Sequence, residues 1–110
     1  MHRAVVHLND AAPQKIQAVL QNITNLYKAL DTQVQVELVA HGPGLAVATT
    51  PATEQLTSLL HQGLTLCACQ NSLTAQNLTP ADLLDGIVIV PSGVAHLVTR
   101  QTEGWSYLHP

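Results

Sequence analysis

The sequence predicts an α/β protein built on a mostly parallel sheet with helices on both faces, and three observations support this fold class. Apolar, β-branched runs alternate with segments of helical periodicity in the order βαβαβαβαβ. The run at 86–90, GIVIV, is fully apolar, as is typical of a central strand buried on both faces. No repeat, linker or low-complexity tract divides the 110 residues, so one domain over 1–110 is expected.

Five strands are expected where short apolar runs end at polar or turn residues. They cover 4–8, 34–40, 64–69 and 86–90, with a short closing strand at 105–108. After the first strand, apolar residues recur three and four positions apart from Ile16 to Leu30, which predicts a helix with one buried face. Asp10 is the candidate N-cap of this helix and Pro13 its first-turn proline.

The later helices are shorter. Thr50 and Pro51 are expected to open one that ends at Gly63, and a short helical turn is one option for 45–48. Short helical pieces are expected at 72–77 and after Thr79-Pro80. The last helix is expected to begin at 91–93 and to stop at Gly104. It is expected to point Val94, Leu97 and Val98 toward the core.

Composition excludes several classes of protein. Net charge is −3 with four Lys and Arg, and aromatic residues make up 3%, so neither a basic stripe for phosphates nor a stacking platform for bases is present. We expect no nucleic-acid partner, no membrane segment, no cofactor and a cytoplasmic location. Hydrophobic residues make up 46% and charged residues only 10%, which favours buried contacts between subunits of a homo-oligomer.

The candidate site lies where parallel strands end, because these ends share one edge of the sheet. Cys69 ends a buried strand directly before a helix, where unpaired N–H groups favour a thiolate. It is the candidate catalytic residue, and the alternative is a small buried hydrophobic residue. The candidate pocket residues at the same edge are His7, Asn9, His41, Gly42, Gln70, Asn71 and Ser92.

The two cysteines are expected to differ. Cys67 lies two residues earlier on the same strand face, and we expect burial to raise the pKa of its thiol. At Cys69 we expect the helix dipole and polar neighbours, including a protonated His41, to lower the pKa instead. A Cys67–Cys69 disulfide is not expected, because the Cα separation along a strand is near the upper limit for such a bond.

Metal and phosphate sites have little support in the sequence. His7, His41 and Cys69 have acceptable zinc ligand types but no local pair spacing, so no metal is expected. The Gly-Pro-Gly turn after His41 lacks the spacing of a phosphate-binding loop. Ser92 lacks the context of a nucleophile and is expected to cap the last helix. The remaining histidines are expected on the surface: His2, His61, His96 and His109.

Five segments, in order, resemble the DsrE-like proteins of the DsrE/DsrF sulfur-relay superfamily, nearly from end to end. They are VVHLND, QNITNLYKAL, VQVELVAHGPGL, CACQNSL and GIVIVPSGVAHLVTRQTEGWSYLHP. The resemblance implies a three-layer α/β/α sandwich around the parallel sheet and assembly into trimers or hexamers. It also implies a strand-end cysteine that carries sulfur as a persulfide, which matches Cys69, and sulfur donor or acceptor proteins as partners.

The chain departs from the family pattern at two positions. His96 stands where relatives usually carry an acidic residue, and His109 where a basic residue precedes the final proline. Both are expected to concern the surface or subunit contacts. A different function class also fits the same strand-end pocket: an oligomeric module that binds a small anion without a covalent step.

Overall fold

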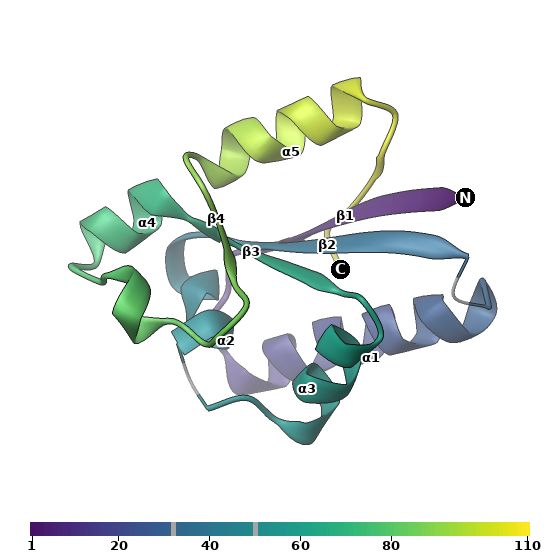
Figure 1. Cartoon of the computed structure of the whole chain (residues 1–110), viewed down its shortest axis with the longest axis horizontal. Helices are drawn as coiled ribbons and strands as arrows, with labels where there is room; N and C mark the ends of the chain where they lie inside the picture. The colour runs from purple at the N-terminus through teal and green to yellow at the C-terminus, as the bar shows by residue number, and fades with distance from the viewer. Residues whose placement is uncertain (32, 50) are drawn as a thin grey trace.

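The computed structural model describes residues 1–31, 33–49 and 51–110. Strands and helices alternate along the chain (Figure 1). The strands are β1 (His2–Leu8), β2 (Val34–Ala40), β3 (Thr65–Cys69), β4 (Val88–Val90) and β5 (Ser106–Leu108). The helices are α1 (Pro13–Ala29), α2 (Ala46–Thr49), α3 (Glu54–His61), α4 (Gln70–Ala75) and α5 (Gly93–Thr102), with 3₁₀ turns η1 (Gly42–Leu45) and η2 (Pro80–Asp82).

The five strands form one sheet in the order β4-β3-β2-β1-β5, and all neighbouring pairs are parallel. In this register His7 lies opposite Val39, and Ala40 lies opposite Ala68. The carboxyl ends of β1, β2 and β3 therefore reach the same edge, as in other open α/β sheets. The predicted fold class, an α/β protein with a parallel sheet and helices on both faces, is confirmed.

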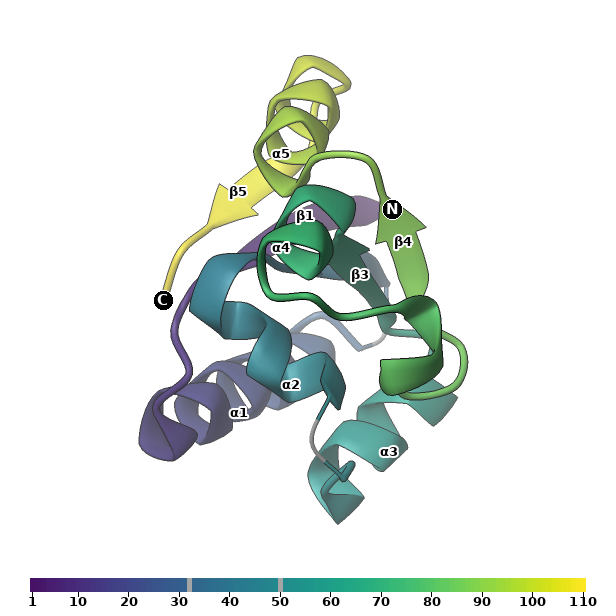
Figure 2. The ribbon, with the colours of Figure 1, turned by 90° about the vertical axis from the view of Figure 1, so that its left-hand side faces the viewer.

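The two faces of the sheet are covered unequally. Helices α1, α2 and α3 lie on one side and α5 on the other (Figures 1 and 2). The first side holds the larger core, in which Ile23 of α1 and Leu59 of α3 join strand residues such as Leu38 and Leu66. The core under α5 is smaller and consists of Val5, Val39, Cys67, Val90, Leu97 and Trp105. The site lies beside this smaller core.

The apolar run at 86–90 is an edge strand, so the prediction of a central strand was wrong. Only Val88–Val90 pairs with the sheet, and β4 has β3 as its single neighbour in the described sheet. Val88 is 46% exposed. An apolar run predicts a strand, but it does not determine how many neighbours the strand has, because that depends on the order in which strands assemble.

Helix starts differ from the prediction at two places. α3 begins at Glu54, with Thr53 as its N-cap accepting a hydrogen bond from the Leu56 N–H, rather than at Pro51. The predicted cap Thr50 lies outside the described residues. Asp10 accepts a hydrogen bond from the Ala12 N–H, but Ala12 occupies the N-cap position of α1. Pro13 stands at the start of α1, as predicted.

Helix α5 presents a different face to the sheet from the one predicted. Leu97 is buried, but Val94 and Val98 are 57% and 58% exposed, so their predicted inward orientation was wrong. The inward face carries His96 and Arg100, which bond to Glu37 of β2. Burying a carboxylate without partners is costly, and this requirement sets the rotation of the helix. Ser92 caps α5 as predicted, accepting a hydrogen bond from the Ala95 N–H at 3.2 Å.

Candidate functional site

Cys69 is the last residue of β3 and the N-cap of α4. The backbone changes there from extended to helical, so the first N–H groups of α4 have no partner within the helix. The residue is only 4% exposed, and the thiol is free. Its side chain therefore lies at the strand edge, beneath the surface.

Polar groups from two helices lie near enough to the Cys69 sulfur to lower the pKa of its thiol, although Cys69 accepts no side-chain cap hydrogen bond from α4. They are the Ser72 hydroxyl and the backbone N–H groups of Gly93, Ser72 and Asn71. Burial by itself raises the pKa of the thiol, but these donors outweigh it and hold the pKa below its ordinary value. This is the direction expected from the sequence. The donors stabilise the thiolate, which is the nucleophilic form of cysteine.

Ser72 connects this site to the turn that follows β2. Its oxygen accepts a hydrogen bond from the Gly42 N–H at 2.7 Å, which leaves the hydroxyl proton available for the sulfur. Gln76 holds the other side of the same turn by donating to the Gly42 carbonyl at 2.8 Å. Two side chains, Ser72 of α4 and Gln76 directly after it, thus fix the position of η1 relative to Cys69.

Gly93 brings the second helix close to the sulfur. A Cβ placed at this position would lie 3.1 Å from the Cβ of His41 and 3.2 Å from the Cβ of Cys69. The absence of a side chain lets the first turn of α5 approach both residues. Ser72 and Gly93 were not among the predicted site residues, although both belong to the first turn of a helix that follows a strand end.

The other predicted pocket residues fall into two groups. Four of them belong to the surroundings of Cys69: the Asn71 N–H acts on its thiol, Gly42 bonds to Ser72, His41 packs at Gly93, and Ser92 caps the helix that carries Gly93. Gln70 is half-buried and donates from its amide to the Thr74 hydroxyl along α4, at 3.2 Å. Asn9 is exposed after β1.

His7 and His41 meet at the ends of β1 and β2. Their Nε2 atoms are 3.3 Å apart and their rings pack edge to face at 4.6 Å. The Nδ1 atom of His7 lies 2.7 Å from the Tyr107 hydroxyl of β5, and His109 stacks on the His7 ring. Tyr107 belongs to this cluster but was not predicted from the sequence.

Both histidines are neutral near pH 7. Burial, together with the neighbouring His109 and His41, lowers the pKa of His7 to about 4, and burial lowers the pKa of His41. The expectation of a protonated His41 beside Cys69 was therefore wrong, because a half-buried imidazole next to another imidazole gains little from a charge. The thiolate is stabilised by N–H and O–H dipoles instead.

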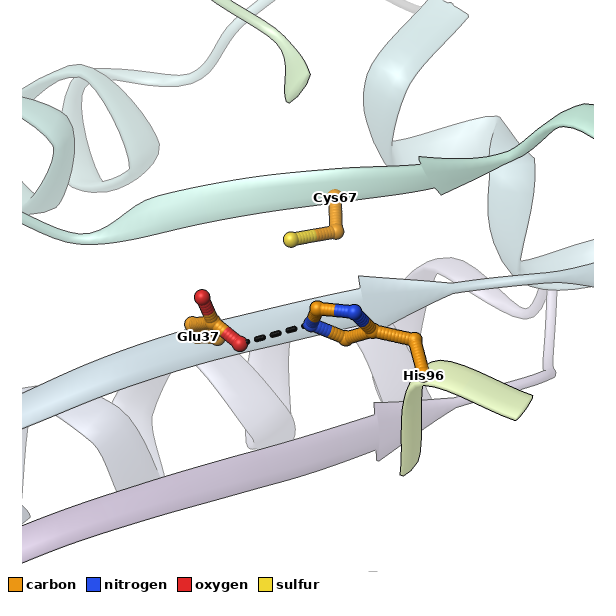
Figure 3. A group of neighbouring side chains, drawn as sticks. All are labelled: Glu37, Cys67 and His96. Atoms are coloured by element: carbon orange, nitrogen blue, oxygen red, sulfur yellow. Dashed lines mark hydrogen bonds and ion pairs between the residues drawn. The ribbon is translucent and has the colours of Figure 1, made fainter. Parts of the chain in front are cut away.

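Cys67 occupies a different environment on the same sheet face. Figure 3 shows its sulfur directed toward the space beside Glu37 of β2 and His96 of α5. Burial and the Glu37 carboxylate raise the pKa of Cys67 to about 12, so it remains a thiol. His96 donates from Nε2 to the Glu37 carboxylate at 2.7 Å and is half-buried. The prediction that His96 lies on the surface was wrong, whereas His2, His61 and His109 are exposed as expected.

Glu37, Cys67 and His96 place three possible metal-ligand atoms within 4.8 Å of one another. The Glu37 carboxylate, however, already accepts two hydrogen bonds from Arg100, at 2.8 and 3.0 Å, besides its contact with His96. Burial opposes the charge of Glu37, but these partners outweigh it and lower the pKa of the carboxyl group. The fully bonded carboxylate and the protonated thiol identify this cluster as an ion-pair network that anchors α5.

No other group of three such ligands lies this close together within 1–31, 33–49 and 51–110. His7, His41 and Cys69 are thus not arranged as a metal site in the described structure. In the same part of the chain, no helix is both long and apolar enough to cross a lipid bilayer.

The protein is thus an α/β protein with a parallel sheet and a free thiol at the carboxyl end of its third strand. The family model described as DsrE/DsrF-like matches residues 3–110, so the chain belongs to the DsrE/DsrF-like family. The structure of MTH1491 from Methanobacterium thermoautotrophicum, a protein of unknown function, is similar with a TM-score of 0.94 and 36% identity over 100% of both chains. The ychN protein from E. coli shares the fold, with a TM-score of 0.78 and 16% identity over 100% of both chains. Comparison with curated proteins gives no match.

Proposed function

We propose that this protein carries sulfane sulfur as a persulfide on Cys69. Membership of the DsrE/DsrF-like family generally implicates sulfur relay. The observation that supports Cys69 as the carrier is its place at the end of β3 and the start of α4, where the Ser72 hydroxyl and three backbone N–H groups lower the pKa of its thiol. Donors that stabilise a thiolate activate it for attack on another sulfur atom.

The reaction is an exchange between a thiolate and a persulfide. The Cys69 thiolate attacks the outer sulfur of a donor R–S–SH, a new S–S bond forms, and the S–S bond of the donor breaks to release the thiolate R–S⁻. Sulfane sulfur moves without net oxidation or reduction, so the step needs no redox cofactor. Because Cys69 is 4% exposed, we expect small persulfide donors to react faster than bulky ones.

Mass spectrometry of the intact protein tests the proposal. Incubation with a low-molecular-weight persulfide should add the mass of one sulfur atom to the wild-type chain, and a thiol reductant should remove it. Cys69→Ser should abolish the addition. Cys67→Ser is the matched control and should load as the wild type does, because Cys67 is a protonated thiol held beside Glu37.

Addition of sulfur to Cys67 rather than Cys69, or no addition to the wild type, would refute the carrier function. The second outcome would favour the alternative class, a module in which the same N–H groups hold a small anion without a covalent step. A titration with inorganic sulfate, followed by the amide NMR signals of Asn71, Ser72 and Gly93, separates the two functions.

We further propose that the protein works as a homo-oligomer, a trimer or a hexamer. Val94 and Val98 form an exposed apolar stripe on α5, and Val88 is exposed on the edge strand. With charged residues at 10% of the sequence, such surfaces favour contact with a second copy of the chain. Light scattering at micromolar concentration should give an oligomer mass, and Val94→Lys combined with Val98→Lys should shift it toward the monomer. A monomeric wild type would overturn this proposal.

A further inference from the structure

The His41 ring contains a buried nitrogen without a hydrogen-bond partner. Its Nδ1 atom is inaccessible to solvent, and within the described residues no donor or acceptor reaches it. Leaving a buried polar atom unsatisfied costs about 1–3 kcal/mol, so such atoms are rare unless a function retains them. The other ring nitrogen, Nε2, faces His7.

The hydrogen bonds that join Tyr107, His7 and His41 permit two arrangements of protons. In the first, Tyr107 donates to His7 Nδ1, His7 Nε2 donates to His41 Nε2, and His41 Nδ1 carries a proton. In the second, each bond is reversed and His41 Nδ1 has a free lone pair. Passing between them moves a proton between the buried Nδ1 atom and the exposed Tyr107, through His7.

The His41 side chain and Cys69 meet at Gly93. Nδ1 is bonded to the same ring carbon that carries the Cβ atom, whereas Nε2 lies at the far end, toward His7. The Cβ atoms of His41 and Cys69 both pack around Gly93, at 3.1 and 3.2 Å from the position a Cβ would take there. Of the two ring nitrogens, Nδ1 is the nearer to the His41 Cβ atom, which packs at Gly93 beside Cys69.

We propose that His41 Nδ1 is the general acid for sulfur transfer at Cys69, and that His7 and Tyr107 are positioning residues that resupply its proton. This inference rests on the proposed persulfide function. It explains why a buried nitrogen without a partner is tolerated and why three polar rings line up at this edge. A neutral imidazole suits the role, because it can donate from one nitrogen while accepting at the other.

The proton balance of the step is complete. As the bond between Cys69 Sγ and the outer sulfur forms and the S–S bond of the donor breaks, the leaving thiolate R–S⁻ takes the proton from His41 Nδ1 and departs as R–SH. His41 Nε2 then takes the proton of His7 Nε2, His7 Nδ1 takes the hydroxyl proton of Tyr107, and water restores the phenol. The proton of the donor's outer sulfur stays on the new Cys69 persulfide.

The test compares rates of sulfur loading among variants that keep the shape of the cluster. His41→Asn retains an amide N–H near the Nδ1 position but cannot transfer a proton, and loading should slow roughly 100-fold, the typical contribution of a general acid. Tyr107→Phe keeps the ring and removes the hydroxyl, and should give an intermediate loss. His61→Gln, which changes an exposed histidine on α3, is the control and should load at the wild-type rate.

Chemical rescue separates an acid from a packing residue. Added imidazole should restore much of the loading rate of His41→Ala, whereas a merely structural role would not respond to it. If the wild type loads sulfur and both His41→Asn and Tyr107→Phe load it at the wild-type rate, the proton relay is refuted and the carrier function stands. If the wild type fails to load, the carrier function itself is refuted and the relay with it.

Discussion

At neutral pH, a limiting amount of a small alkylating reagent should label Cys69 about a hundred times faster than Cys67. The pKa of Cys67 is raised to about 12, and that of Cys69 lies below its ordinary value, so their thiolate fractions differ by roughly three powers of ten. A thiolate whose thiol has a lower pKa is also a weaker nucleophile, which removes part of the difference in labelling rate between Cys69 and Cys67. Exposure contributes little, since Cys67 and Cys69 are 1% and 4% exposed.

Single-cysteine variants make the comparison clean. The rate for Cys67→Ser reports on Cys69 alone, and the rate for Cys69→Ser reports on Cys67 alone. Raising the pH from about 7 to about 9 should increase the Cys67 rate about tenfold per pH unit, because its thiolate remains a minor form over this range. The Cys69 rate should rise less steeply with pH, because the pKa of its thiol lies below the ordinary value. Two equal rates, or no reaction before denaturation, would show that the donors around Cys69 do not activate it.

Gly44→Ala should destabilise the protein more than any other glycine-to-alanine substitution among the six glycines. A Cβ at Gly44 would lie 2.1 Å from the Leu8 carbonyl oxygen, 2.7 Å from the Leu8 carbonyl carbon and 3.1 Å from the Asn9 Cα atom. All three are backbone atoms, so no side-chain rotation relieves the overlap. We expect a loss of about 4 kcal/mol or more, a large part of the stability of a domain this size.

Urea denaturation followed by the fluorescence of the buried Trp105 measures this loss. Gly63→Ala is the control: Gly63 has a φ of +104°, but a Cβ added there would have no atom within 4 Å, so only backbone strain opposes the change. That strain costs about 1–3 kcal/mol. Equal losses for the two variants would show that the turn after β2 can move away from β1.

Much of the fold follows from local sequence pattern. The β2 strand lies at 34–40, as predicted, and its alternation places Val36 and Leu38 in the larger core while Glu37 faces α5 on the other side of the sheet. The edge position of β4 did not follow from pattern, because an apolar run is equally compatible with one or two neighbouring strands. The rotation of α5 was also missed, since it depends on Glu37, which is far away in sequence.

The candidate site was only partly accessible to sequence reasoning. Cys69 at a strand end and the histidines at the same edge follow from topology alone. The donors Ser72 and Gly93 depend on how two helices approach one sulfur, which is a tertiary property. One signal was available in the sequence. Glu37 interrupts an apolar strand, and His96 and Arg100 stand four positions apart on one helix face, so an ion pair between Glu37 and this helix was a reasonable expectation.

The pairing of β1 with β5 gives the chain a particular order of assembly. Val5 of the first strand pairs with Tyr107 of the last, and His7 bonds to the same tyrosine across 100 residues. Contacts this distant in sequence form late, because the intervening loop must first be closed. During synthesis, Cys69 and its helix leave the ribosome well before Tyr107 does. Cys69 is therefore made after His7 and His41 but before Tyr107, and the ring cluster is complete only after the last strand has joined the sheet.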